Sequence, residues 1–285
     1  MSTETVKVKL TMSYDGQAYS GWQIQKTGLG VQQRVEESLA KLFGNPVRIH
    51  SSSRTDTGVH AIGMVAHLVL EKREFRMTPS KLVLALNAHL PEDIRVVSAS
   101  RCRDDFHARF DATGKQYRYF VWNQAAHNPL LRKLSWHIPQ ALDLKAMRQS
   151  AQLLVGRHDF KSFAATRSYE MASTVRTLFR CDVRKQGCLL TFILEGDGFL
   201  YKMCRGIVGT LVQVGQGKIG AGDIPRILET RARCAGGMSA PAHGLVLWKV
   251  RYRPRSVRKD LRSVEGAGED PIVGSTRLSA SDRDS

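Results

Sequence analysis

The stretch VKVKLTMSY at residues 6–14 alternates apolar and polar side chains. Val8, Leu10 and Met12 share one face of the extended chain, which is the two-residue period of a strand with one buried face. A second alternating stretch, QYRYFVWN at residues 116–123, opens the second half of the chain. We therefore expect two halves of similar plan, each beginning with a sheet strand.

Helical and extended patterns follow each of these strands in a similar order. We expect helices at 31–43, 79–90, 142–154, 199–214 and 224–230, and further strands at 47–52, 63–70, 177–185, 188–195 and 245–252. This order predicts an α/β (α+β) fold of two α/β domains, in which mixed, mainly antiparallel sheets form a central cleft. We place the domains at residues 1–110 and 111–253. Residues 254–285 lack periodicity, and we expect a disordered tail there.

The charge of the chain points to a polyanionic partner. Its 285 residues carry 43 Lys and Arg against 26 Asp and Glu, a net charge of +17. The tail contributes nothing to this excess, because its 6 basic residues balance its 6 acidic ones. The folded part of the chain therefore carries the whole excess of positive charge. This favours nucleic acid as the partner over an anionic membrane surface, and over a role of the charge in solubility alone.

Several classes of protein are disfavoured by missing patterns. No signal peptide and no long apolar span occur, and the odd count of five cysteines predicts free thiols in the cytoplasm. A phosphate-binding loop, a complete dinucleotide-binding glycine motif and a Cys/His cluster are also missing. We expect no membrane association, no metal and no cofactor, so catalysis would depend on ordinary side chains.

The stretch SSSRTDTGVHA at residues 51–61 is the best candidate for such chemistry. It places the Asp56 carboxylate two residues after the Arg54 guanidinium, on a loop tightened by Gly58. On local sequence alone, a turn in which Asp56 bonds its own backbone explains the pattern as well.

This loop resembles the active-site loop of the tRNA pseudouridine synthase A family, and other family motifs follow in the same order. They are YDG (14–16), GWQ (21–23), NA and LP (87–91), DFHARF (105–110), YRY (117–119), NPL (128–130), HDF (158–160), FLYKMCR (199–205), IVG (207–209), AP (240–241) and GL (244–245). The resemblance spans residues 8 to 252. The chain departs from the family pattern at Ser51–Ser53, Lys202 and Gly206.

The resemblance implies an isomerase that detaches uracil from its ribose, rotates it and rejoins it through carbon, after flipping the nucleotide from the RNA. Asp56 would be the nucleophile, and Arg205 would pair with it and hold its rotamer. Arg54 would bind a phosphate or fill the space of the flipped nucleotide. Tyr117 would pack against the base, with a hydroxyl able to move a proton.

Three more residues are candidates for substrate binding. Leu245 matches a family residue in apolar contact with the base, although a strand leucine is equally a core residue. His60 and His107 are candidates for contacts with the RNA backbone, although a histidine beside a tight loop is as often a structural hydrogen-bonding partner. For Tyr119, one pleat beyond Tyr117, a core position is favoured.

The implied substrate is the anticodon stem-loop of tRNA, at positions 38, 39 and 40, and the implied assembly is a homodimer. A dimer would place basic surface of the second subunit under the tRNA that the first subunit holds. Two alternatives compete with the enzyme: a non-catalytic RNA-binding or tRNA-folding protein, and a DNA-binding protein. The combination of Asp56, Arg54, Tyr117 and Arg205 argues against the first, and the lack of a helix-turn-helix or zinc-finger pattern against the second.

Overall fold

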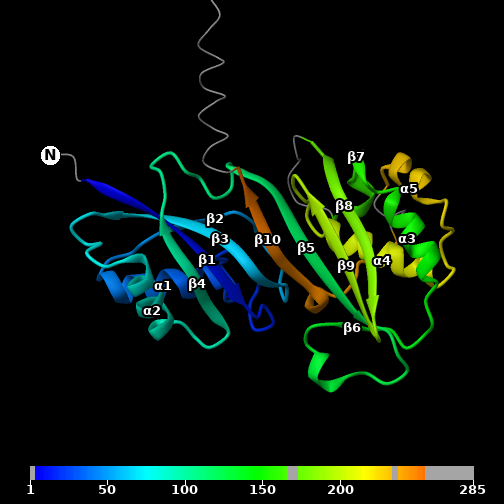
Figure 1. The fold of residues 1–285 in the computed structure, drawn as a ribbon, viewed down its shortest axis with the longest axis horizontal. Coiled ribbons are helices and arrows are strands. Elements are labelled where there is room, and N and C mark those ends of the chain that lie inside the picture. Colours follow the sequence, from blue (N-terminus) through cyan, green and yellow to red (C-terminus); the bar gives the residue numbers. More distant parts are fainter. Residues whose placement is uncertain (1–3, 166–172, 233–236, 254–285) are drawn as a thin grey trace, which may run out of the picture. The chain divides into compact units, whose positions relative to one another are not determined.

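Ten strands form one mixed sheet in the part of the chain that the computed structural model describes, residues 4–165, 173–232 and 237–253 (Figure 1). The described residues up to Tyr252 form one compact unit. The tail that we expect to be disordered, residues 254–285, lies outside the described residues.

Among the described residues, the first half of the chain supplies four strands and two α-helices, and the second half six strands and three α-helices. The first set is β1 (Thr5–Tyr14), α1 (Val31–Phe43), β2 (Ile49–Ser51), β3 (His60–Glu71), α2 (Pro79–His89) and β4 (Ile94–Arg101). The second is β5 (Ala112–Trp122), β6 (Trp136–His137), α3 (Leu144–Gln152), β7 (Gly156–Asp159), β8 (Val175–Gln186), β9 (Leu189–Gly196), α4 (Met203–Gly215), α5 (Ile224–Thr230) and β10 (Leu245–Tyr252).

The two halves meet where β10 lies between β3 and β5. The strand order is β4-β1-β3-β10-β5-β9-β8-β7, with β2 beside β3 and β6 beside β5. Strand β10 pairs antiparallel with β5 along its length, but parallel with β3 at only two residue pairs. The predicted mixed, mainly antiparallel architecture is confirmed. The division near residue 110 falls between β4 and β5, within one compact unit, and the two-domain description stays a prediction.

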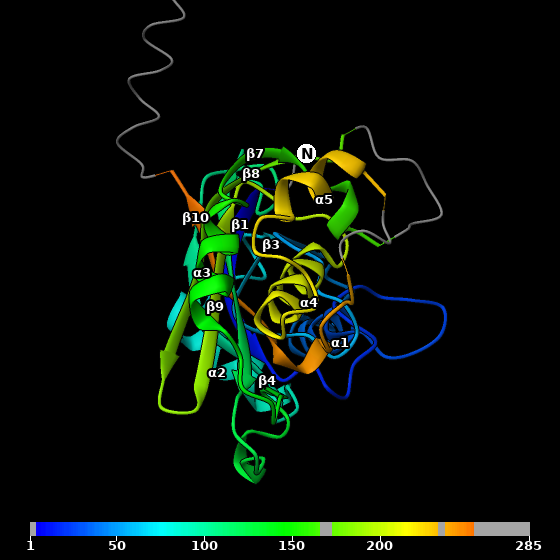
Figure 2. The same cartoon turned by 90° about the vertical axis from the view of Figure 1, so that its right-hand side faces the viewer.

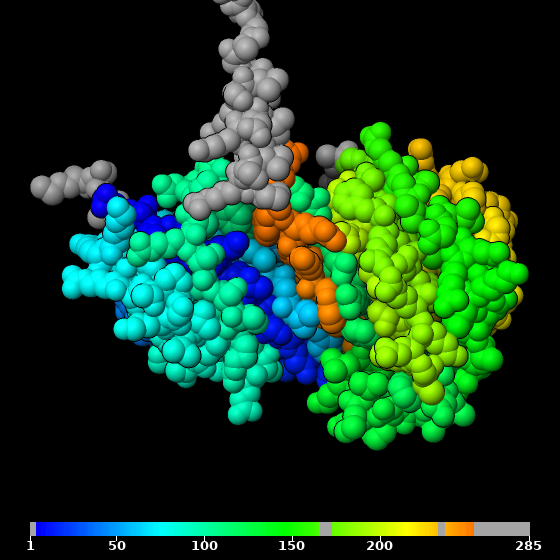
Figure 3. All heavy atoms as spheres, in the orientation of Figure 1, coloured from blue at the N-terminus to red at the C-terminus, as the bar shows by residue number. Residues whose placement is uncertain are grey.

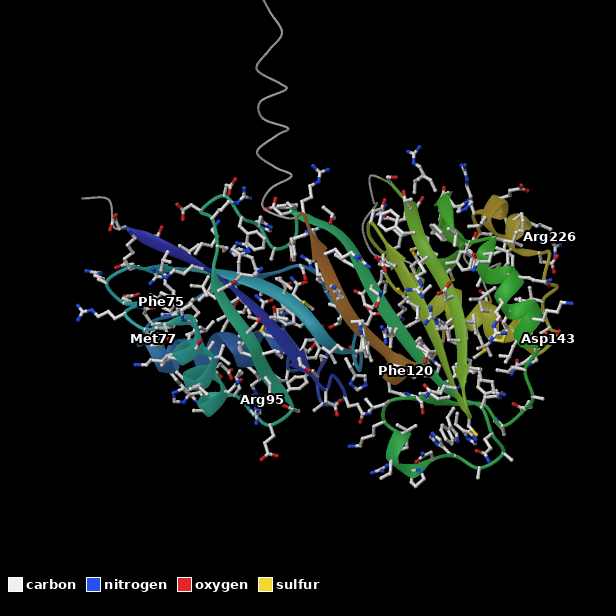
Figure 4. The ribbon with its side chains drawn as sticks, viewed as in Figure 1. Phe75, Met77, Arg95, Phe120, Asp143 and Arg226 are labelled. Carbon is white, nitrogen blue, oxygen red and sulfur yellow. The ribbon has the colours of Figure 1, made fainter. Side chains whose placement is uncertain are left out.

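Helices α1 and α4, one from each half, lie on the same side of the sheet (Figure 2). On this side β1 buries Val8, Leu10 and Met12 completely, as their alternation predicts. The opposite side is open: side chains of β10, in orange, reach the surface between those of β3 and β5 (Figure 3). Residues of β5 alternate accordingly, so Phe120, labelled in Figure 4, contacts Trp248 while its neighbour Tyr119 is buried.

Helix α4 begins later than its apolar pattern predicts. Residues 199–202 are not helical, because Lys202 adopts φ 60 in the left-handed region and the helix starts at Met203. A left-handed conformation costs a side-chain-bearing residue about 1 kcal/mol or more, so the surrounding structure must hold it there. The segment that precedes α4 therefore forms a turn, and this turn lines the site described next.

Candidate active site

The Asp56 loop connects β2 to β3 and is bonded to the segment that follows β1. The Tyr14 hydroxyl and Thr55 Oγ1 lie 2.8 Å apart in a buried hydrogen bond. The backbone N–H of Trp22 donates to the Thr55 carbonyl at 3.1 Å, and that of Gly58 donates to Tyr19 at 3.4 Å. Both sides of Asp56 are thus anchored to residues 14–22, which fixes the direction of its side chain.

Two glycines of that segment are needed because the loop approaches too closely for a side chain. A Cβ on Gly16 would lie 2.0 Å from the carbonyl oxygen of Val59, and one on Gly21 would lie 2.6 Å from that of Thr55. Gly21 also has φ +94, which favours glycine. The YDG and GWQ motifs are therefore the support of the Asp56 loop.

Arg205 reaches Asp56 from the first turn of α4. Its Nη1 lies 3.7 Å from Asp56 Oδ2, and the two side chains are 15% and 18% exposed. Its Nε donates to the Ala240 carbonyl at 2.7 Å, and the Ala240 N–H donates to the Arg205 carbonyl at 3.0 Å. The guanidinium is therefore fixed on one side and paired with the carboxylate on the other.

Close helix packing places Arg205 at this position. A Cβ on Gly206 would lie 2.3 Å from the Phe163 carbonyl oxygen, and one on Gly209 would lie 1.7 Å from that of Met238. The chain departs from the family pattern at Gly206, and this contact is the physical reason for glycine there. Helix α4 can approach its neighbours only because both positions lack a side chain.

Asp56 lies in a pocket of about 60 Å³ that also touches Arg54, Tyr117 and Leu245. The sheet register brings these residues together, because Leu245 of β10 pairs with Tyr119 of β5 and the next residue, Val246, pairs with His60 at the end of the loop. Four of the predicted site residues thus share one pocket, and Arg205 joins them through its ion pair with Asp56.

The pocket adjoins a groove of about 830 Å³, and Arg54, Tyr117 and the turn before α4 line both. The cations of the groove wall are Arg54, Arg109, Lys115 and Arg176. No Asp or Glu occurs among the described residues that line it. The groove therefore presents positive charge that leads to a single carboxylate.

Tyr117 is held with its ring toward the pocket and keeps its proton. Phe199 packs edge-to-face against it, with ring centroids 5.1 Å apart. Burial raises the pKa of Tyr117 well above its usual range, and the neighbouring Cys204 and Asp56 add to the effect. Tyr119 is fully buried and donates to the Pro241 carbonyl at 2.8 Å, so the interpretation of this residue as core is confirmed.

The two histidines differ in their positions. His60 is 3% exposed, accepts from the Gly16 N–H at 3.2 Å and donates from Nε2 to the His243 carbonyl at 3.1 Å. It connects the Asp56 loop to the start of β10 and lines neither the pocket nor the groove. His107 lines the groove. Contact of either residue with RNA stays a prediction.

Sequence reasoning did not single out several residues of the site. Arg109, Phe110, Lys115 and Arg176 line the groove, and Lys202 lines the pocket. Only the DFHARF and FLYKMCR motifs could have indicated three of them. Lys115 and Arg176 carry no local signal, because a cation on a strand is ordinarily a solvated residue.

The described residues lack two kinds of feature, a cluster of metal ligands and a helix that could cross a membrane. Within the described ranges, no three His, Cys, Asp or Glu side chains gather in a way that would hold a metal ion. None of the helices in these ranges is long and apolar enough to cross a membrane. The expectation of catalysis without a cofactor stays a prediction.

Comparison with known proteins shows to which family of proteins the chain belongs. The model of a family described as tRNA pseudouridine synthase matches residues 10–111 and 150–253. The chain therefore belongs to this family of pseudouridine synthases, which the resemblance had predicted.

The similar proteins within this family carry a more specific name, tRNA pseudouridine synthase A. The chain is 45% identical over 253 residues to tRNA pseudouridine synthase A of Syntrophotalea carbinolica, covering 87% of this chain and 97% of the relative. It is 43% identical over 247 residues to the protein of the same name from Geotalea uraniireducens, covering 86% and 99%. A chain in a crystal structure of a Cbf5-Nop10-Gar1 complex aligns over 75% of this chain and 55% of its own length, with 11% identity and a TM-score of 0.31.

The close approach of Gly16 to the Asp56 loop can be tested by measuring the stability of variants. Gly16→Ala should lower the free energy of unfolding by about 1–3 kcal/mol, because the new methyl group overlaps the Val59 carbonyl. Gly222→Ala is the matched control, since a Cβ there meets nothing within 4 Å, and it should change stability by no more than about 1 kcal/mol. Urea unfolding of both variants measures the difference. Equal stability of the two would contradict the close approach.

Proposed function

We propose that this protein isomerises uridine to pseudouridine in tRNA, with Asp56 as the nucleophile. Membership of the tRNA pseudouridine synthase family supports the reaction. One observation supports the assignment of the site: Asp56 is the sole carboxylate among the described residues that line the pocket, and this pocket adjoins a basic groove. A polyanion would be attracted to the groove, while only the pocket offers a charged nucleophile.

In the proposed complex the RNA backbone follows the groove and one uridine leaves its stack to enter the pocket. A base stacked inside an RNA helix is out of reach of a carboxylate at the bottom of a small pocket, so the nucleotide must flip. Arg54 is exposed and lines both the pocket and the groove. We assign it to a phosphate of the flipped nucleotide or to the space that the base leaves.

The proposed chemistry needs one bond to break and another to form. The bond from ribose C1′ to uracil N1 breaks, a bond from C1′ to C5 forms, and the proton on C5 leaves while N1 gains one. The reaction is redox neutral. Asp56 attacks the reacting nucleotide and forms a transient bond to it, which breaks again to release the free carboxylate before pseudouridine leaves. Arg205 holds this carboxylate in place. Tyr117 and Leu245 supply the apolar walls between which the detached uracil turns.

Tyr117 acts in this scheme through its ring and its bound proton. Because its pKa is raised well above the usual range, the phenol stays neutral and can donate a hydrogen bond. It does not act as a phenolate base at neutral pH. Cys204 lies beside it in the pocket, and burial followed by the Asp56 charge raises the pKa of this thiol, so it does not compete as a nucleophile.

The target uridines and the location in the cell are proposed from the resemblance to the tRNA pseudouridine synthase A family. We propose the uridines at positions 38, 39 and 40 of the anticodon stem-loop as the target, and the cytoplasm as the location. The four cysteines of the described residues, Cys102, Cys181, Cys188 and Cys204, form no disulfide, which is in keeping with a reducing compartment.

We also propose that the active form is a homodimer, because one body of this size spans less than a tRNA. A second subunit would extend the basic surface under the part of the tRNA that the first does not reach. Light scattering at micromolar concentration should give twice the monomer mass. A monomer at that concentration would contradict the dimer and would leave the proposed reaction intact.

The role of Asp56 has a direct test. Asp56→Asn keeps the volume and removes the charge, so formation of pseudouridine in tRNA should fall by at least about 10³-fold. The affinity for tRNA should stay equal or rise slightly, since an anion facing RNA opposes ground-state binding. Single-turnover rates and filter binding measure the two effects. A variant with near-parental turnover would exclude the nucleophile.

Two arginine variants serve as matched comparisons. Arg205→Ala should resemble Asp56→Asn, with a large loss of rate and little change in affinity, because Arg205 acts through the carboxylate. Arg54→Ala should weaken binding and rate together, because its proposed contact is with the RNA itself. The reverse pattern would contradict both assignments. A parent protein that binds tRNA and forms no pseudouridine would support the non-catalytic alternative.

The groove should lose affinity for RNA as the pH rises. Burial, followed by the charges of Arg109 and Arg176, lowers the pKa of Lys115 to about 8. The ammonium is present at pH 7 and largely lost at pH 9, so tRNA affinity should fall several-fold between these values. Lys115→Arg stays charged and should flatten this profile. The affinity for tRNA should be measured against pH at constant ionic strength. A parental affinity that does not change with pH would contradict a phosphate contact by Lys115.

A further inference from the structure

The turn that follows β4 presents two exposed side chains to the groove. Arg109 and Phe110 are both exposed, Phe110 to 73%, and both line the groove wall. The Arg109 guanidinium carbon lies 5.6 Å from the centre of the Phe110 ring. Singly exposed apolar side chains are ordinary on a protein surface, but this ring lies in the wall of a cationic groove, where it is placed to contact a ligand.

The turn is rigid, because two histidines accept its backbone N–H groups. Nδ1 of His107 accepts from Arg109 at 3.1 Å and from Phe110 at 3.3 Å. Nδ1 of His67 accepts from Ala108 at 3.1 Å. The Tyr252 hydroxyl of β10 donates to the Ala108 carbonyl at 2.7 Å. The backbone of the turn is thereby fixed from three directions.

Both histidines are suited to this task because they stay neutral. Burial, followed by the charges of His107 and His50, lowers the pKa of His67 to about 4. Burial is also the first cause of the lowered pKa of His107. A neutral imidazole keeps the Nδ1 lone pair that these hydrogen bonds need.

The Phe110 ring has one covered face. Its centroid lies 4.3 Å from that of His107, at an interplanar angle of 34°, so the imidazole supports it from one side. At 73% exposure most of the ring surface is open to a planar partner. A supported ring beside a guanidinium, in a groove with three further cations, offers stacking and a phosphate contact together.

We propose that Phe110 stacks on an unpaired base of the RNA substrate outside the Asp56 pocket, and that Arg109 binds the phosphate beside that base. This inference rests on the proposed function, because it requires RNA in the groove. The stacked base is a neighbour of the flipped uridine. Holding it would position the strand while the uridine occupies the pocket. His107 and His67 are positioning residues for the turn.

Phe110→Ala should raise KM for tRNA about 5- to 100-fold, the range that stacking on one base provides, with kcat at saturation changed less than about 3-fold. Phe110→Trp should retain the parental KM because it keeps a π face, whereas Phe110→Leu should resemble Phe110→Ala. Phe179→Ala is the control, since Phe179 is 50% exposed on β8 and is not among the residues that line the groove. It should retain the parental values.

A fluorescent base gives a readout that a structural role would not move. Anticodon stem-loop RNAs that carry 2-aminopurine at single unpaired positions should show one position quenched by the parent and by Phe110→Trp, and not by Phe110→Ala. A parental KM for Phe110→Ala, or quenching that does not depend on Phe110, overturns the proposal. A change of oligomeric state without a change in KM also overturns it, since Phe110 would then contact a second copy. A parent without pseudouridine formation instead refutes the proposed function.

Discussion

The insertion of β10 between β3 and β5 is the constraint on which the site depends. Its parallel pairing with β3 covers only Val246 with His60 and Leu247 with Ala61. This short contact sets the end of the Asp56 loop beside the start of β10, and the antiparallel pairing with β5 then sets Tyr117 next to both. A shift of one residue in either register would turn Tyr117 or Leu245 to the other face of the sheet. The site is therefore a product of strand pairing.

Helix α4 supplies the positive charge that pairs with Asp56. Helix α4 approaches its neighbours through Gly206 and Gly209, and this places Arg205 within 3.7 Å of Asp56. A half-buried carboxylate without a partner would be costly, and the guanidinium offsets that cost while it fixes the rotamer.

Local pattern predicted the strongly amphipathic elements and missed the edges of the sheet. Strand β1 and helix α1 have buried faces with clear periods, and both were predicted closely. Strands β4 and β7 were not predicted. Each lies at an end of the sheet and pairs on one side only, so it needs no continuous buried face: Val97 of β4 is 59% exposed, and β7 reads GRHD. The predicted start of α4 was early, because φ 60 at Lys202 is imposed by packing.

The sequence by itself determined the chemistry of the candidates and the family. An Arg-Thr-Asp loop, its companion motifs and a net charge of +17 are local or additive properties, so they can be read without coordinates. Only the tertiary structure decided which candidates meet. It joined Asp56, Arg54, Tyr117, Leu245 and Arg205, gave His60 an internal role, and brought Lys115 and Phe110 to the groove. These outcomes depend on strand register and on close helix packing between distant segments, which no local pattern encodes.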